Sequence, residues 1–176
     1  MKQNLLVVSY DYDLSKQIAT KLADVFSMRV FDQKELFEFD HIPMSFTEIY
    51  EMNGAEYVKK EMKSIVNMEL DFDNAAFAAD MSFADNCTEL FYKIKLSNFV
   101  VLLYKDIKKE IAELSQKKYL SEAEKEFFCP DENLLKKREL SLSFDCVDIK
   151  VDISDLSQTE IVEKIVDKIE EYYSVN

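Results

Sequence analysis

The chain has 176 residues, of which 48% are hydrophobic and 12% aromatic, and its formal net charge at pH 7 is −13. This composition excludes low-complexity disorder and is typical of one globular domain over residues 1–176. The negative charge argues against nucleic acid and against an anionic membrane surface as partners, because both are bound through Lys and Arg side chains.

Neither the apolar runs nor the cysteines suggest a membrane or secreted protein. After the N-terminal apolar run Leu5–Val8, the longest apolar run is Phe99–Tyr104, which is far shorter than the roughly 20 residues of a transmembrane helix. The three cysteines are widely spaced and form no C-x-x-C pair, which is typical of a reducing compartment and supplies no zinc site. We therefore expect a cytoplasmic protein without a signal peptide.

Apolar runs of strand length alternate with helical periodicity along the chain, which is the pattern of βαβ units. We predict a three-layer α/β/α fold around a central, mainly parallel, five-stranded sheet. The expected strands are Leu5–Val8, Met28–Phe31, Ala75–Ala79, Phe99–Tyr104 and Val147–Val151.

The first helix is predicted from apolar residues that recur every three or four positions. Leu14, Ile18, Leu22 and Val25 would lie on one face of this helix. Asp13 precedes them and is the expected N-cap, so its carboxylate would accept hydrogen bonds from the first backbone N–H groups.

Two capping boxes predict the starts of later helices. Ser45 with Glu48 begins one, and Ser157 with Glu160 begins the closing helix. Gly54 interrupts the helical pattern, which resumes over Ala55–Leu70. The residues expected to face inward are Val58, Met62, Ile65 and Met68 on the helix over Ala55–Leu70, and Ile161, Ile165 and Ile169 on the closing helix.

The segment of about residues 112–136 is charged and has few apolar anchors. We expect a mobile, lid-like helical excursion there. It interrupts the strand and helix alternation before the last strand.

The connection between the first strand and the first helix has the rhythm of a phosphate-binding loop but none of its glycines. It reads S-Y-D-Y-D-L-S-K over residues 9–16, and Gly54 is the only glycine of the chain. Loop glycines allow positive φ and let backbone N–H groups approach phosphate oxygens. The segment therefore suggests a nucleotide-kinase architecture and argues against nucleotide chemistry at the same place.

Over nearly its whole length the order of elements and landmark residues resembles the shikimate kinase family of P-loop kinases. The closest part is Met44–Glu51 followed by Gly54, which resembles the family's M-S-I-x-E-I-F-x-x-x-G-E stretch. The resemblance implies a P-loop kinase fold with a helical lid. For an active member it also implies Mg-ATP as cofactor and a small-molecule alcohol as substrate.

The resemblance places the family's phosphate loop, G-x-x-G-x-G-K-[ST], on residues 9–16, and every defining position differs. The positions of its three glycines, its lysine and its magnesium ligand are taken, in this order, by Ser9, Tyr12, Leu14, Ser15 and Lys16. Asp32 matches an aspartate that assists magnesium in the family, and it is the one metal-ligand candidate.

The substrate and lid positions implied by the resemblance differ as well. Lys34 replaces an aspartate that binds shikimate hydroxyls, and Lys59 replaces an arginine that binds the substrate carboxylate. The family's glycine triplet corresponds to Asp80, Met81 and Ser82, its lid arginine to the region of Lys117, and its R-x-P-L-Y motif to Lys137 and Arg138. No catalytic position is intact.

Three hypotheses of function follow. The first is a pseudokinase, with no cofactor expected, that binds a protein partner or a small anion or serves regulation. The second is an active ATP-dependent small-molecule kinase with an atypical loop. Asp32 would then hold magnesium, and an anion pocket would be lined by Lys16, Lys34, Lys59, Lys137 and Arg138.

The third hypothesis is a protein–protein interaction module. Tyr10 and Tyr12 flank the phosphate-loop position and could fill it or present a contact patch. The sequence leaves the partner and the oligomeric state open.

Overall fold

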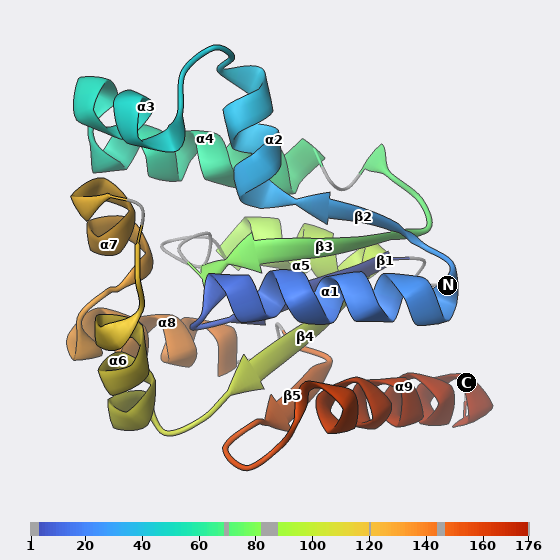
Figure 1. Cartoon of the computed structure of the whole chain (residues 1–176). Helices are drawn as coiled ribbons and strands as arrows, with labels where there is room; N and C mark the ends of the chain where they lie inside the picture. Colours follow the sequence, from blue (N-terminus) through green and yellow to red (C-terminus); the bar gives the residue numbers. More distant parts are fainter. Residues whose placement is uncertain (1–3, 69–70, 82–87, 120, 144–146, 176) are drawn as a thin grey trace.

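The computed structural model describes residues 4–68, 71–81, 88–119, 121–143 and 147–175, with the side chains of 88–92, 138–143 and 175 outside that description. Its five strands form one parallel sheet in the order β2-β3-β1-β4-β5 (Figure 1). The strands are β1 (Asn4–Ser9), β2 (Arg29–Asp32), β3 (Ala75–Asp80), β4 (Asn98–Tyr104) and β5 (Ile149–Asp152).

Helices cover both faces of the sheet because alternate strand residues point to opposite sides. Leu5 and Val7 of β1 pack under α1 (Tyr12–Phe26) and α9 (Gln158–Val175), which lie together on the near face in Figure 1. Leu6 and Val8 face the other way. The opposite face is covered by residues of α4 (Ala55–Met68), α5 (Thr88–Ser97), α6 (Ile107–Gln116) and α8 (Glu132–Ser143).

A third apolar cluster lies beyond the sheet and is mostly aromatic. It joins α2 (Gln33–Asp40), α3 (Phe46–Asn53) and α4 to α7 (Glu122–Phe128). Phe46 of α3 contacts both Phe127 and Phe128 of α7, with ring centroids 5.5 and 5.4 Å apart. This cluster therefore holds α7 against α3.

The structure confirms the predicted fold class. The five strands lie where the apolar runs predicted them, within one or two residues at each end. Both capping boxes are present: Glu48 accepts from the backbone N–H of Ser45, and Glu160 accepts from that of Ser157, each at 2.8 Å. The predicted excursion of residues 112–136 contains the end of α6, all of α7 and the start of α8.

Two local predictions are wrong. The N-cap of α1 is Asp11, not Asp13, because the helix begins at Tyr12 and Asp13 already lies in its first turn. Met68, which was expected to face inward, is 43% exposed, and Val25, which the pattern placed on one face with Ile18 and Leu22, is 54% exposed. Each lies in the last turn of its helix. Leu70, the predicted end of α4, is outside the described residues.

Gly54 ends α3 in a conformation that other residues rarely adopt. Its φ is +80° and its ψ 169°, and its N–H donates to the Tyr50 carbonyl oxygen at 2.8 Å. This region of backbone space is essentially restricted to glycine. The only glycine of the chain thus serves the turn between α3 and α4. In the described part of the chain, no helix combines the length and apolar character needed to cross a membrane.

Candidate functional site

The site predicted from the sequence lies at the carboxyl ends of the parallel strands, where open α/β folds bind ligands. Only Tyr10 and Asp11 separate the end of β1 from the first residue of α1. The Asp11 carboxylate accepts from the backbone N–H groups of Asp13 at 3.0 Å and Leu14 at 3.4 Å. A side chain of the protein therefore binds the helix N-terminal donors that could otherwise bind an anion.

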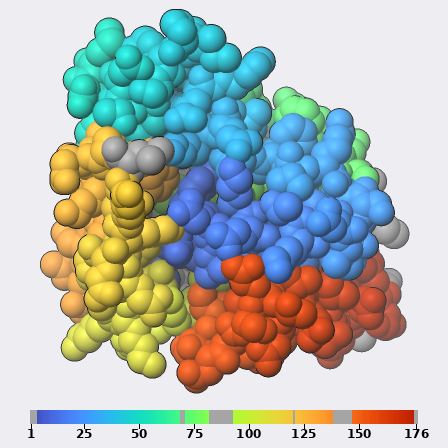
Figure 2. All heavy atoms as spheres, in the orientation of Figure 1, coloured from blue at the N-terminus to red at the C-terminus, as the bar shows by residue number. Residues whose placement is uncertain are grey.

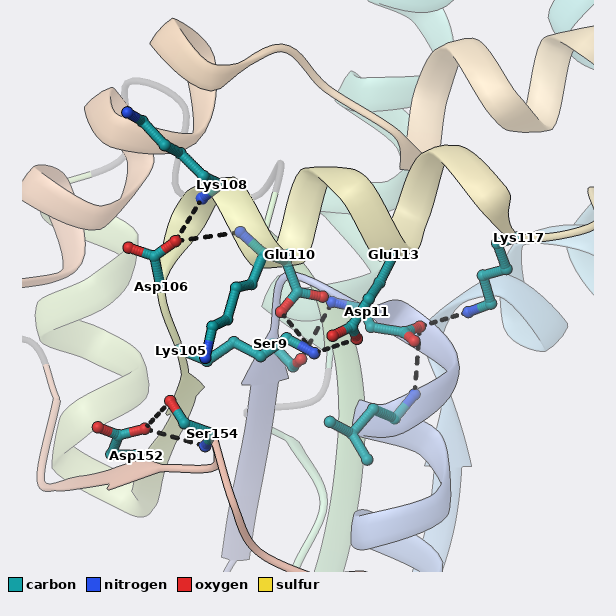
Figure 3. Close-up of polar contacts among 12 residues, drawn as sticks. Ser9, Asp11, Lys105, Asp106, Lys108, Glu110, Glu113, Lys117, Asp152 and Ser154 are labelled. Carbon is teal, nitrogen blue, oxygen red and sulfur yellow. Dashed lines mark hydrogen bonds and ion pairs between the residues drawn. The ribbon is translucent and has the colours of Figure 1, made fainter.

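Lys117, which follows α6, is paired with two carboxylates at the start of α1. Its ammonium group binds Asp11, as Figure 3 shows, and Asp13 Oδ2 at 2.6 Å. Burial alone would lower the pKa of Lys117, but its hydrogen bonds to Asp11 and Asp13 raise that pKa above its ordinary value. This lysine, at the lid position of the resemblance, is thus engaged within the chain.

A further acidic pair, Glu110 and Glu113, stands on α6. Glu110 is 1% exposed, lies 3.3 Å from the ammonium group of Lys105, and shares that lysine with Glu113 (Figure 3). Burial raises the pKa of Glu110, Lys105 opposes that shift, and the charge of Asp11 adds to it. The α6 side of the site therefore presents carboxylates as well as cations to the loop.

Tyr12 takes a central place in the site although it stands at a glycine position of the resemblance. It is 6% exposed, and its ring stacks on Phe128 with centroids 5.3 Å apart. Its hydroxyl donates to Asp32 Oδ1 and accepts from the backbone N–H of Lys34 at 2.8 Å. Burial and the Asp32 carboxylate raise the pKa of Tyr12 well above its usual value, so the hydroxyl stays neutral at pH 7.

Asp32, the metal-ligand candidate, is already bound to several groups of the chain. Besides the Tyr12 hydroxyl, it accepts the backbone N–H of Glu35 at 2.9 Å, and its Oδ2 lies 2.9 Å from the ammonium group of Lys16. Lys16 also pairs with Glu35 at 2.5 Å. Lys16 therefore places a cation on Asp32. In the described part of the chain, no three His, Cys, Asp or Glu side chains are grouped so as to hold a metal ion.

Lys34, at the substrate position, forms an ion pair across the site to α7. Its ammonium group lies 2.5 Å from Glu124 Oε1, and Glu124 is 6% exposed. The same ammonium lies 5.7 Å from the ring centroid of Phe46 and 6.0 Å from that of Phe128. A hydrogen bond of 2.8 Å from the Thr47 hydroxyl to that of Ser121 adds a second link between α3 and the segment before α7.

A cavity of about 210 Å³ lies between the start of α1 and the α6–α7 segment. Figure 2 shows this segment, in yellow and orange, beside the blue start of the chain. Asp11, Asp13 and Glu124 contribute carboxylates to its walls. The apolar or aromatic walls come from Tyr12, Leu114, Tyr119 and Phe128, and the cations from Lys34, Lys117 and Lys118.

The other phosphate-loop candidates are buried or half-buried and do not line this cavity. Ser9 ends β1 at 1% exposure, and its hydroxyl oxygen accepts from the Asp11 N–H at 3.0 Å. Leu14 packs against the apolar cluster beneath α1 and α9. Ser15 is fully buried inside α1, and its hydroxyl has no hydrogen-bond partner in the described residues.

The remaining candidates are not gathered at the cavity. Lys59 pairs with Glu56 of its own helix at 3.0 Å, and Lys137 is exposed on α8. Asp80 ends β3 at 3% exposure, and its backbone N–H donates to Gln33 Oε1 at 2.8 Å. Arg138 belongs to α8, but its side chain and all of Ser82 lie outside the described residues.

Glu124 and Phe128 are two of the site residues that were not predicted from the sequence. Glu124 stands three residues after Ser121, the N-cap of α7, so its spacing suggests a capping role rather than an ion pair with Lys34. Phe128 looks like an ordinary apolar anchor of a short helix. Only the tertiary structure brings both to the start of α1.

Solved structures of kinases share this fold over nearly the whole chain. The shikimate kinase from Acinetobacter baumannii, in complex with shikimate, has a TM-score of 0.77 and 15% identity, with 98% of this chain and 95% of that chain covered. The shikimate kinase from Aquifex aeolicus vf5 has a TM-score of 0.72 and 17% identity, with 98% of this chain and 100% of that chain covered. A gluconokinase from Sinorhizobium meliloti 1021 has a TM-score of 0.53 and 9% identity, with 97% and 93% covered.

At these identities the likeness concerns the fold alone. The chain has the fold of shikimate kinases and related P-loop kinases, as its sequence predicted. No protein-family model matches the sequence, and no curated protein matches it.

Proposed function

We propose that this protein is a pseudokinase: it keeps the P-loop kinase fold, transfers no phosphoryl group, and has a binding or regulatory role. The observation that carries the proposal is the pairing of charges within the chain. Lys117 is paired with Asp11 and Asp13, and Lys16 with Asp32. Lys34 and Lys59, at the substrate positions of the resemblance, are paired with Glu124 and Glu56.

The residues present do not fit the phosphates of Mg-ATP. Phosphates at the start of α1 would meet the carboxylates of Asp11 and Asp13 and would have to displace Lys117 from both. Two like charges about 4 Å apart repel each other by about 4 kcal/mol at the effective dielectric constant near a protein surface. Asp11 also occupies the N–H groups of the first helical turn, which a phosphate would need.

Asp32 and Tyr12 also make the site a poor fit for Mg-ATP. A magnesium ion on Asp32 would have to replace the ammonium group of Lys16, and Tyr12 fills the space that a loop glycine would leave free. Phosphoryl transfer depends almost wholly on positioning the phosphates and neutralising their charge. Because such groups act as a unit, their combined loss is expected to abolish the reaction.

Calorimetric titration with Mg-ATP tests the proposal directly. We expect no saturable heat up to about 1 mM nucleotide, a concentration at which even weak specific binding is measurable. A coupled assay with shikimate is expected to give no phosphorylated product. An active shikimate kinase in the same buffer serves as the positive control.

The opposite result has a clear signature. If the chain bound Mg-ATP with a Kd below about 0.1 mM, and Lys16→Ala abolished that binding, the alternative of an active kinase with an atypical loop would replace the proposal. Transfer of phosphate to shikimate or to another small alcohol would have the same consequence.

A further inference from the structure

We propose that the cavity between the start of α1 and the α6–α7 segment binds a small zwitterion, a free α-amino acid with an apolar side chain. The inference rests on the proposed function in one respect: the cavity is free of nucleotide phosphates. It names a ligand class for the binding role that the pseudokinase proposal leaves open.

The size of the cavity selects a small metabolite. Drug-sized ligands occupy pockets of about 300–1,000 Å³, whereas this cavity measures about 210 Å³. At about 30 Å³ for each water molecule in the liquid, it has room for about seven waters. An amino acid such as leucine is of this size, and a nucleotide is much larger.

The charges on the walls favour a ligand that carries both signs and no net charge. Three carboxylates, from Asp11, Asp13 and Glu124, face three ammonium groups, from Lys34, Lys117 and Lys118. A ligand of either single charge would meet as many like charges as opposite ones. A zwitterion can turn each end toward the opposite sign.

The groups on the cavity wall that are not used in contacts within the chain include both a hydrogen-bond acceptor and a donor. Asp13 uses Oδ2 for Lys117, and its Oδ1 accepts nothing from the described residues, so it can accept from a ligand ammonium. Lys118 is exposed at the rim and has no ion pair in the described part of the chain. It can therefore bind a ligand carboxylate.

Tyr119 supplies a second donor on the same side as Lys118. It lines the cavity, and its hydroxyl is buried beside the Cys129 sulfur, a weak acceptor, with no oxygen or nitrogen partner in the described residues. Buried polar groups of native proteins nearly always have a partner, so an orphan group calls for an explanation. A ligand carboxylate that accepts from Tyr119 and Lys118 provides one.

The rest of the wall suits an apolar side chain. Tyr12 and Phe128 present stacked rings, and Leu114 adds an aliphatic surface. Small-molecule sites typically combine such apolar walls with a few convergent polar groups. The cavity therefore fits an aliphatic or small aromatic amino acid better than a polar one.

Calorimetry with five free amino acids tests the inference: alanine, valine, leucine, methionine and phenylalanine. Each is compared with the amine that lacks its carboxylate and with the acid that lacks its amino group. We expect at least one amino acid to bind with a Kd below about 1 mM, and about tenfold more tightly than either of its halves. The inference would be overturned if none of the five amino acids bound at about 10 mM, or if the amine or the acid bound as tightly as the amino acid itself.

Two conservative variants locate the binding. Tyr119→Phe removes only the orphan hydroxyl, and Lys118→Gln removes only the rim charge, so both should fold as the parent does. Each is expected to weaken amino-acid binding by about three- to tenfold, the effect of one lost hydrogen bond. Lys125→Gln, on the exposed side of α7, is the matched control and should leave the affinity unchanged. Unchanged affinity in both cavity variants would place the ligand elsewhere and overturn the inference.

The two proposals fail in different ways. Absence of amino-acid binding together with absence of Mg-ATP binding overturns this inference and leaves the pseudokinase proposal standing. Mg-ATP binding that a saturating amino acid does not change overturns the pseudokinase proposal instead.

Discussion

Tyr12 stands at a loop-glycine position of the resemblance and is part of the protein core. Its ring belongs to the aromatic cluster that holds α7, and its hydroxyl joins Asp32 to the backbone of Lys34. A glycine at this position would leave the cluster without one wall and the buried carboxylate without one donor. The sequence could show that the loop glycine was absent, but not that its replacement had become a core residue.

Removing only the Tyr12 hydroxyl should destabilise the protein. Tyr12→Phe keeps the ring but leaves the buried Asp32 carboxylate short of a donor and the partly buried Lys34 N–H short of an acceptor. We expect the free energy of unfolding to fall by about 1–3 kcal/mol, the cost of leaving buried polar groups unsatisfied. Urea denaturation followed by circular dichroism measures this loss.

The control for this variant is Tyr173→Phe on α9, where the tyrosine is 41% exposed. It should change the stability by less than about 0.5 kcal/mol, as most exposed substitutions do. If both variants lost the same small amount, the Tyr12 hydroxyl would have no structural role.

At the scale of helices and strands, the sequence predicted most of the fold because local signals are strong there. The all-apolar run of β4 and the capping boxes of α3 and α9 depend only on neighbouring residues. The site could not be predicted in the same way. The pairs Lys117–Asp11 and Lys34–Glu124 join residues 106 and 90 positions apart, and no local pattern reveals such partners.

The errors at helix ends have a related cause. Periodicity assigned Met68 to the inner face of α4, but it cannot tell where the packing against a helix stops. Either of two aspartates could cap α1, and the choice of Asp11 depends on where the helix begins. Helix boundaries are therefore less predictable than the existence of the helices.

The lysine after α6 should hold the α6–α7 segment against α1. Lys117→Gln removes the charge that pairs with Asp11 and Asp13 and leaves Asp11 able to cap α1. We expect faster hydrogen exchange in α7, by about threefold or more, because local opening becomes easier when an anchoring contact is lost. Exchange in α1 should change little. Hydrogen exchange read by mass spectrometry measures both helices in one experiment.

Lys125→Gln on α7 is the control for this variant, because its only ion pair in the described residues is a 4.0 Å contact with the exposed Glu122. It should leave exchange in α7 near that of the parent. Equal exchange in the Lys117 variant and the parent would mean that the aromatic cluster alone holds the segment.

Across the whole molecule, apolar packing and charge pairing act on different parts of the kinase fold. The two clusters on the sheet faces preserve the parallel α/β core, and the third cluster closes α7 onto α3. The ion pairs are concentrated where these parts meet, at the carboxyl ends of the strands. The apolar clusters therefore build the fold, and the ion pairs link its elements at the site.

This arrangement should make the protein sensitive to alkaline pH. The pKa values of Lys16, Lys105 and Lys117 are raised in the folded state, where burial opposes the shift and bonds to carboxylates outweigh it. Their stabilising effect is fully present below the unfolded lysine pKa of about 10.4 and is lost as pH rises through the folded values. Burial also raises the pKa values of Tyr12 and Tyr119, so these tyrosines ionise first in the unfolded chain, near pH 10.

Both groups act in the same direction, and we expect the free energy of unfolding to fall from about pH 10 upward. Each buried tyrosine contributes up to about 1.4 kcal/mol per pH unit. The partly exposed Lys16 contributes less, because solvent screens its ion pairs. Urea denaturation at several values between about pH 8 and 11 measures the slope. The Tyr12→Phe variant removes the most deeply buried of these groups, so its slope should be shallower although its stability at pH 8 is lower. A stability that stayed constant to about pH 11 would show that the lysine pairs and buried hydroxyls make no net contribution to folding.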